Sequence, residues 1–505
     1  MNSQSGNDIP LKPVGVNRQD SGVVGVSTGI RNADNEGTLE TTFLHTEPIE
    51  SQKPSEESTN GLKAYSVVIG SFLGLIANFG VLNSIGAIQS YVSLHQLKDI
   101  ETSSISWIFS IYMYLSFAIG IIVGPIFVMK GSFAPLLYGT VLIVGGFMAT
   151  ANCTKVWQFI LSFICVGTGH GLCITPLVGV VSQHWTANAI GRATGFATIG
   201  GSIGGVILPL MLRSLFPKVG FAWSIRILGF FCLACMICAM LLAREKYCTD
   251  LIPMDSASTD YEEMNKRKKF KAASKNILSF NALRDIKYSF LIIGVFFGEL
   301  ALMLIVTYYA SYAIAQGMSE SAAYILLTIF NACGVLGRWI PGHMADIWGP
   351  YNVMILMLIC LDISIMVVWL PFGSNVGVLY AFAALSGAFS ASILSLLPVL
   401  LSSVTVYSIK KVKVSKQQNP FAEDEVESTE VRYPLEFGQK YGLLYFFVSL
   451  GNLFGIPIAS AVIGDKSKHN YDMFVLLSGI FAIIGTVFWI ISRYCIVGFK
   501  LNVKI

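Results

Sequence analysis

Five polar side chains interrupt long apolar stretches of this 505-residue chain, and these residues are the best placed to do chemistry. They are two asparagines, a histidine, a glutamate and an arginine, namely Asn83, His170, Glu299, Asn331 and Arg338. A charged side chain deep in such a stretch costs about 2.5 to 3.5 kcal/mol on insertion scales unless it is paired, hydrated or protonated. Residues that carry this cost commonly bind a polar solute or transfer protons. We therefore select these five as candidate substrate-binding or coupling residues, with Glu299 as the principal one.

Other kinds of active site find little support in the residues. The six histidines lie on separate segments, and only His170 lies deep in an apolar stretch, where a hydrogen bond between two helices is the open alternative. Cys232, Cys235 and Cys238 have no nearby His or acidic partner, so we interpret them as packed thiols. The nucleotide-binding pattern Gly-x-x-x-x-Gly-Lys-Ser/Thr does not occur, which argues against an ATP-driven pump. We expect neither enzymatic activity nor a cofactor or metal.

The composition is that of a polytopic membrane protein, because 54% of the residues are hydrophobic and only 13% are charged. About 20 apolar residues are needed for a helix to cross the hydrocarbon core of a bilayer. Segments of roughly that length cover 66–88, 106–129, 134–151, 157–181, 190–212, 221–243, 289–312, 322–341, 351–371, 376–402, 441–463 and 473–494. We expect an all-α fold with 12 transmembrane helices in two six-helix bundles.

Polar stretches divide the chain and predict its orientation. Residues 244–288 join an N-terminal bundle (62–243) to a C-terminal bundle (289–495), and this linker carries ten Lys and Arg residues. A second polar stretch, 407–440, carries six and is interpreted as an unstructured cytoplasmic insertion. Because positive residues concentrate in cytoplasmic loops, the linker, the insertion and both termini are predicted to be cytoplasmic. The tails are 1–61, which is expected to be disordered, and 496–505.

This organisation resembles the major facilitator superfamily. Twelve spans with a long central loop are typical of it, and so is a Gly and Asp motif in a short cytoplasmic loop, here Gly342-x-x-Ala345-Asp346-x-x-Gly349 between spans eight and nine. The matching stretch between spans two and three, 124–131, keeps its glycines and lacks the Asp. The resemblance implies a transporter that works by alternating access, in which two halves rock about a site near the middle of the membrane.

A narrower resemblance is to the monocarboxylate-porter family, and within it to the fungal branch that includes riboflavin-transporting relatives. It rests on the span-five signature with its small-residue face of Gly195, Gly201 and Gly205, and on three further matches. The signature begins at His184-Trp185, and the further matches are the entry to the first span at Asn60-Gly61-Leu62-Lys63-Ala64-Tyr65, Gly220-Phe221-x-Trp223-x-x-Arg226 and Gly337-Arg338-Trp339-x-Pro341-Gly342. Animal lactate porters have a Lys and an Asp at the positions of Asn83 and Gly334, and keep an arginine where this chain has Arg338. The resemblance therefore implies a riboflavin-like substrate more than a monocarboxylate-like one.

From this we expect a secondary transporter of a small organic solute. A nutrient sensor of the same fold that transports nothing is the alternative. The expected partners are the solute, protons if transport is proton-linked, and membrane lipid, with no nucleic acid and with the chain acting as a monomer. The plasma membrane is the expected location, and the vacuolar membrane is the alternative.

Overall fold

The computed structural model describes residues 61–185, 189–245, 280–417, 429–464 and 467–498, and all the regular structure in these residues is helical. The predicted N-terminal tail and most of the predicted linker lie outside the described residues. Within the described ranges, 11 helices are long and apolar enough to cross a membrane. The expectation of an all-α membrane fold is confirmed. Two of the predicted spans form one run, Ile190–Leu242, which is divided by a non-helical residue at Gly220, so each of the 12 predicted spans has its counterpart in the described residues.

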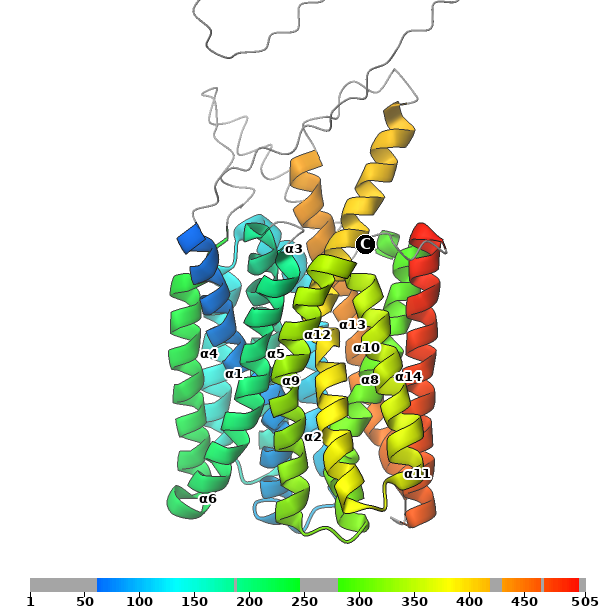
Figure 1. Cartoon of the computed structure of the whole chain (residues 1–505). Helices are drawn as coiled ribbons and strands as arrows, with labels where there is room; N and C mark the ends of the chain where they lie inside the picture. Colours follow the sequence, from blue (N-terminus) through cyan, green and yellow to red (C-terminus); the bar gives the residue numbers. More distant parts are fainter. Residues whose placement is uncertain (1–60, 186–188, 246–279, 418–428, 465–466, 499–505) are drawn as a thin grey trace, which may run out of the picture. The chain divides into compact units, whose positions relative to one another are not determined.

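The N-terminal half runs from Gly61 to Leu242 (Figure 1). Its helices are α1 (Gly61–Leu94), α2 (Thr102–Ala118), α3 (Gly120–Lys130), α4 (Phe133–Thr150), α5 (Val156–His184) and α6 (Ile190–Leu242). Helices α2 and α3 together form the predicted second span. The 53-residue α6 contains predicted spans five and six, which are joined at Gly220 with a φ of 72°. Only glycine adopts this backbone conformation readily, and so the chain can reverse its direction there.

The C-terminal half runs from Phe280 to Val497. It contains η2 (Phe280–Arg284), α8 (Ile286–Ala315), α9 (Glu320–Trp348), α10 (Pro350–Ile363), the π-helix η3 (Ser364–Trp369), α11 (Leu370–Phe372), α12 (Val376–Gln417), α13 (Thr429–Ile463) and α14 (Lys468–Val497). Helix α9 continues seven residues beyond Pro341, where the sequence predicted the end of span eight. The Gly and Asp motif therefore lies on the last turns of a helix and not in a loop.

The prediction of an unstructured insertion at 407–440 was wrong where the structure describes it. Helix α12 continues to Gln417 and α13 begins at Thr429, so both helices extend well past the apolar segments (Figure 1). Residues 406–417 contain no Gly or Pro and are rich in Lys, which costs little in a helix. A helix that has already formed is easily extended, since each added residue contributes one more hydrogen bond.

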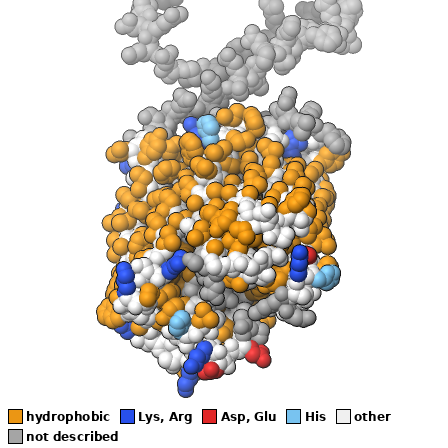
Figure 2. Space-filling view, turned by 60° about the horizontal axis from the view of Figure 1, so that its bottom comes forward, with side chains coloured by type: hydrophobic (Ala, Val, Ile, Leu, Met, Phe, Trp, Pro, Cys, Tyr) orange, Lys and Arg blue, Asp and Glu red, His pale blue; other side chains and the backbone are white. Residues whose placement is uncertain are grey.

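The outer surface is apolar along the sides of the bundle. Figure 2 shows hydrophobic side chains covering the side of the molecule, while the coloured charged side chains gather toward its ends. Trp157, Leu161 and Leu241 are each more than half exposed in this band. Such a continuous apolar belt is what a lipid-facing surface requires.

The two halves meet along two seams of close helix contact. One seam joins α6 to α9, and the other joins α2 and α3 to α13. We call the end of the bundle where α6 stops and α8 starts the linker end, and the opposite end, which holds Gly220, the far end. In Figure 1 the linker end is uppermost.

Glycines let the helix backbones touch in both seams near the linker end. At Gly195 an added Cβ would lie 2.7 Å from the carbonyl oxygen of Arg338, and Gly191 faces the backbone of Gly342 in the same way. In the other seam Gly120 and Gly124 face the backbones of Gly442 and Gly438. Any side chain at these positions would push the helices apart, so the two halves are tightly closed at the linker end.

Candidate functional site

The charged residues selected from the sequence, Glu299 and Arg338, lie together in the interior. Glu299 on α8 is 1% exposed and Arg338 on α9 is 3% exposed. Arg338 Nε donates a hydrogen bond to Ser202 Oγ on α6 at 2.8 Å. The two charged groups are close enough to interact electrostatically, yet they form no direct ion pair in the described part of the chain. Glu299 Oε1 and Arg338 Nη1 are buried without a hydrogen-bond partner among the described residues.

Aromatic side chains from three other helices surround this pair. Tyr445 on α13 interacts electrostatically with both Glu299 and Arg338. Its ring stacks on Phe117 of α2, with centroids 5.3 Å apart and planes inclined by 9°. The Arg338 guanidinium lies 6.0 Å from the centre of the Phe79 ring on α1. We call Glu299, Arg338, Tyr445 and Ser202 the central cluster. It draws on both halves of the molecule, as a site between two moving halves must.

The two asparagines lie near each other beside Gly205, and each donates a hydrogen bond to a backbone carbonyl. Asn83 Nδ2 donates to the carbonyl of Gly201 at 3.2 Å, and Asn331 Nδ2 donates to the carbonyl of Leu327 at 3.0 Å. An added Cβ at Gly205 would lie 2.5 Å from Asn331 Oδ1 and 2.9 Å from Asn83 Cβ, so the asparagines meet over this glycine. Asn331 precedes Arg338 by seven residues, which is about two helical turns or roughly 10 Å.

His170 lies apart from the central cluster, inside the N-terminal half. It is fully buried on α5, and its Nδ1 is 2.8 Å from the hydroxyl of Tyr112 on α2. The neighbouring Gly169 packs against α4. A hydrogen bond between two helices, which the sequence left open for this residue, is thus present in the structure. Its Nε2 has no partner among the described residues.

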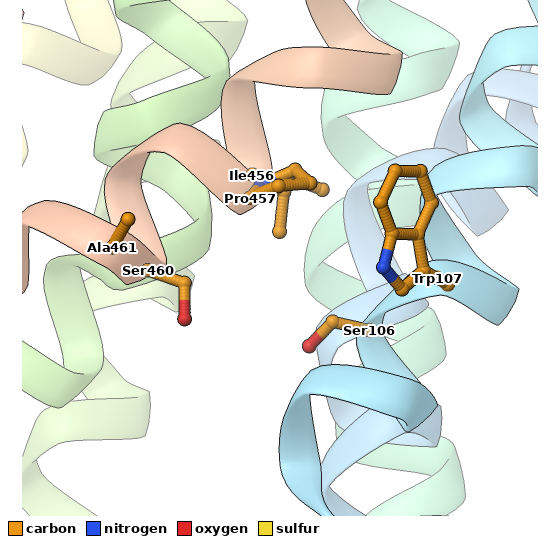
Figure 3. A pocket seen from close by; sticks show the side chains of 6 residues that line it. All are labelled: Ser106, Trp107, Ile456, Pro457, Ser460 and Ala461. Carbon is orange, nitrogen blue, oxygen red and sulfur yellow. The ribbon is translucent and has the colours of Figure 1, made fainter. Parts of the chain in front are cut away.

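A cavity of about 250 Å³ opens between α2 and α13 on the far side of the central cluster. Figure 3 shows Ser106 and Trp107 of α2 across the cavity from four residues of α13, namely Ile456, Pro457, Ser460 and Ala461. The buried Asn452 comes one turn before Ile456, on the side of the linker end, and seven residues after Tyr445, so the three share one face of α13. Neither polar atom of the Asn452 side chain has a partner among the described residues. A line of groups on α13 therefore leads from the cavity towards the central cluster.

The Gly and Asp motif fastens the two halves together at the linker end. Asp346 Oδ1 accepts a hydrogen bond from the backbone N–H of Gly191 at 2.8 Å, and Oδ2 accepts from the N–H of Arg192 at 3.0 Å. The side chain of Arg192 adds an ion pair at 3.1 Å. Since the first N–H groups of a helix lack internal partners and carry partial positive charge, the carboxylate stabilises the start of α6. Gly349, with a φ of 87°, then turns the chain into α10.

The described residues include no group of three or more His, Cys, Asp and Glu side chains arranged to hold a metal ion. The nine cysteines among them are free thiols. Tyr445, Phe117 and Phe79 were not selected from the sequence, because aromatic residues are common in membrane helices and carry no signal of their own. Ser202 does have a signal: it is the hydroxyl residue within the glycine-rich face of span five.

Comparison with known proteins gives a consistent picture. A sequence model described as Major Facilitator Superfamily matches residues 67–408. The riboflavin transporter MCH5 of Saccharomyces cerevisiae is 39% identical over 448 residues, covering 87% of this chain and 80% of that protein. MFS-type transporter 1 of an Ophiocordyceps species is 30% identical, covering 91% of each chain. The aspyridones efflux protein apdF of Emericella nidulans is 29% identical, covering 80% of this chain and 73% of its own.

Solved structures share the fold at low sequence identity. The fucose:proton symporter FucP of E. coli has a TM-score of 0.57 at 15% identity and covers 86% of this chain and 99% of its own. A bacterial homologue of the iron transporter ferroportin, in an outward-facing state, has a TM-score of 0.58 at 11% identity, and covers 85% of this chain and 99% of its own. The family match spans most of the chain, and the helical architecture agrees with it. The chain belongs to the major facilitator superfamily and is a multi-pass membrane protein.

Proposed function

We propose that this protein is a secondary transporter of a small, flat, uncharged organic solute of the riboflavin type. The observation that carries the proposal is the central cluster, in which Glu299 Oε1, Arg338 Nη1 and the Tyr445 hydroxyl of the C-terminal half are buried without a hydrogen-bond partner among the described residues, and Ser202 of the N-terminal half holds Arg338 in place. The 39% identical relative named as a riboflavin transporter supports this substrate class. The presence of Asn83 and Gly334 where lactate porters have a Lys and an Asp disfavours a simple monocarboxylate as the solute.

The proposed mechanism is alternating access. In the present conformation the glycine contacts and Asp346 close the linker end, while the cavity beside Trp107 lies toward the far end. A solute would enter from the far end and reach the central cluster along the face of α13 that carries Asn452 and Tyr445. Closing of the far end would then accompany the breaking of the Asp346 contacts and separation of the two glycine seams.

Glu299 is the proposed coupling residue. A lone carboxylate in the interior is costly, and both the guanidinium of Arg338 and a bound proton reduce that cost. Tyr445 is the further titratable group that faces the pair, from α13. A proton taken up by Glu299 would release Arg338 from its electrostatic partner, so proton movement and solute binding are linked through the same two side chains.

The proposed orientation places the linker end and both termini in the cytoplasm, as the positive charges of residues 244–288 predict. The cavity then faces the outside of the cell or the lumen of an organelle. The plasma membrane is the proposed location, with the vacuolar membrane as its alternative. A relative is named as an efflux protein, which favours export of a solute from the cytoplasm as a second direction of transport for the same site.

The test is net flux with the purified full-length chain. Proteoliposomes are loaded with buffer, and uptake of labelled riboflavin is compared with that of labelled lactate and with protein-free liposomes. We expect saturable riboflavin uptake that exceeds lactate uptake at equal concentration. Saturable binding of riboflavin without flux in either direction would instead establish the sensor alternative. Flux of lactate alone would refute the substrate class.

A further inference from the structure

The geometry of the central cluster indicates which chemical edge of a solute it recognises, an inference that rests on the proposed function. Glu299 Oε1 and Arg338 Nη1 are both buried and both lack a hydrogen-bond partner in the described chain. Leaving a buried polar group unpaired is costly, and more so when the group is charged. One atom is an acceptor and the other is a donor, and they belong to side chains that interact electrostatically without touching.

The position of Arg338 is fixed by contacts of its side chain and of its helix. Arg338 is held through its Nε by Ser202, so its guanidinium cannot swing freely toward α8. Its helix is also pressed against α6 at Gly195 and, through Gly337, against the backbone of Ala388 on α12. With α9 packed on two sides, Arg338 is held in place on its own helix.

The pair discriminates among simple charged groups. A carboxylate offers only acceptors, so it would pair with Arg338 and be repelled by Glu299. An ammonium group would pair with Glu299 and be repelled by Arg338. A neutral group that carries an N–H beside a C=O supplies a donor to one side and an acceptor to the other. Cyclic imides and ureides have such an edge, and they are planar.

The surroundings fit a flat ring that bears such an edge. The stacked rings of Tyr445 and Phe117 lie on one side of the pair, and the Phe79 ring lies beside the guanidinium. Asn452 lies about 10 Å further along α13, by helical rise. Its amide offers unused donors and an acceptor, which suit a hydroxyl group on a side chain of the solute.

We propose that Glu299 and Arg338 recognise the imide edge of a flat heteroaromatic solute, in which a ring N–H lies between two carbonyl groups. Glu299 accepts a hydrogen bond from the ring N–H, and Arg338 donates to an adjacent carbonyl oxygen. Carboxylate-bearing solutes of similar size are excluded by Glu299. A carboxyl oxygen accepts this bond in either protonation state, so the assignment is compatible with proton coupling through the same residue.

The experiment uses riboflavin and N3-methylriboflavin, which differ by one methyl group on the ring N–H. Inhibition of labelled riboflavin uptake into proteoliposomes is measured for each compound. Because a hydrogen bond to a charged group contributes a factor of about 10 to 150 in affinity, we expect the methylated compound to inhibit about 10- to 150-fold more weakly. Glu299→Ala should bring the two compounds to within a few-fold of each other, since it removes the acceptor and makes room for the methyl group.

Asp362→Ala is the matched control. Asp362 is another carboxyl group inside the C-terminal half, on α10, and it accepts a hydrogen bond from Thr486 of α14 at 2.7 Å. It lies outside the central cluster, and this variant should discriminate between the two flavins as the unmodified chain does. If Glu299→Ala does not transport, the same comparison is made by quenching of flavin fluorescence on binding to the solubilised protein.

The outcomes separate this inference from the proposed function. Riboflavin uptake that is inhibited equally by both compounds in the unmodified chain would leave the proposed function standing and overturn the imide assignment. Discrimination that persists in Glu299→Ala would also overturn it, because the N–H would then be recognised elsewhere. Absence of both riboflavin flux and riboflavin binding would overturn the proposed function and the inference together.

Discussion

Removing the carboxylate of Asp346 should open the linker end. This side chain accepts two backbone hydrogen bonds from the start of α6 and forms one ion pair, and all three contacts join the two halves. Hydrogen bonds to a charged group contribute about 1.5 to 3 kcal/mol, and a carboxylate at a helix N-terminus contributes up to about 2 kcal/mol. Because these two contributions overlap, we expect Asp346→Ala to destabilise the closed linker end by about 2 to 3 kcal/mol. At about 1.4 kcal/mol per factor of ten, the ratio of closed to open linker end should fall roughly 30- to 140-fold.

Alkylation of a thiol in the seam measures this ratio. Thr198 lies on the same face of α6 as Gly191 and Gly195 and is fully buried, so Thr198→Cys places a reporter where a water-soluble maleimide can react only after the seam opens. The rate of alkylation is measured on the protein in detergent. The alkylation of the native cysteines is measured on the chain without the reporter and is subtracted. Asp346→Ala should raise the rate roughly 30- to 140-fold.

The matched control is Arg192→Ala in the same reporter background. The Arg192 side chain is 52% exposed, and exposed ion pairs contribute about 0.2 to 1 kcal/mol, so the rate should rise only about 1.5- to 5-fold. A rate for Asp346→Ala within threefold of the unmodified chain would refute the assignment of Asp346 as the contact that holds the linker end closed.

Three further changes have defined outcomes. Gly195→Val places a side chain against the carbonyl of Arg338, so the seam cannot close and uptake in proteoliposomes should fall at least tenfold, while Gly86→Val, where an added Cβ meets nothing within 4 Å, should have little effect. Glu299→Gln should abolish the dependence of the initial uptake rate on pH, because an amide cannot take up a proton there, and a pH profile that follows the unmodified chain would disprove its coupling role. Ser202→Ala frees Arg338 Nε and should raise the KM for solute more than it lowers kcat, whereas an equal fall in folded yield and rate would indicate a merely structural contact.

The type and approximate position of the membrane-spanning helices could be predicted, because membrane spans follow directly from apolar length. The ends of several helices could not be predicted. The sequence placed spans five and six on either side of Gly220, where the backbone is indeed non-helical, but the helix of span five continues up to this glycine and does not end at residue 212. The helical ends of α12 and α13 were missed because polar composition was taken as evidence of disorder, although Lys-rich segments without Gly or Pro extend a helix readily.

For the candidate site, the sequence indicated Glu299 and Arg338, because a charged side chain in an apolar segment is unfavourable in free energy. It could not show that the two side chains are close enough to interact. They lie on different helices, and their approach depends on how α8 and α9 pack. Asp346 was identified from its motif, yet its partners lie 154 and 155 residues away on α6. Tyr445 and Phe117 gave no signal because their role comes from stacking between two halves of the chain. The structure places His170 outside this group, against Tyr112.

The central claim is that Glu299 and Arg338 together form the solute site between the two halves. It is tested most directly by uptake of labelled riboflavin into proteoliposomes that contain the unmodified chain, Arg338→Ala or Asp362→Ala, each at equal folded protein content. The account predicts saturable uptake by the unmodified chain and by Asp362→Ala, and at least a tenfold loss of affinity in Arg338→Ala. Unchanged affinity in Arg338→Ala would contradict it.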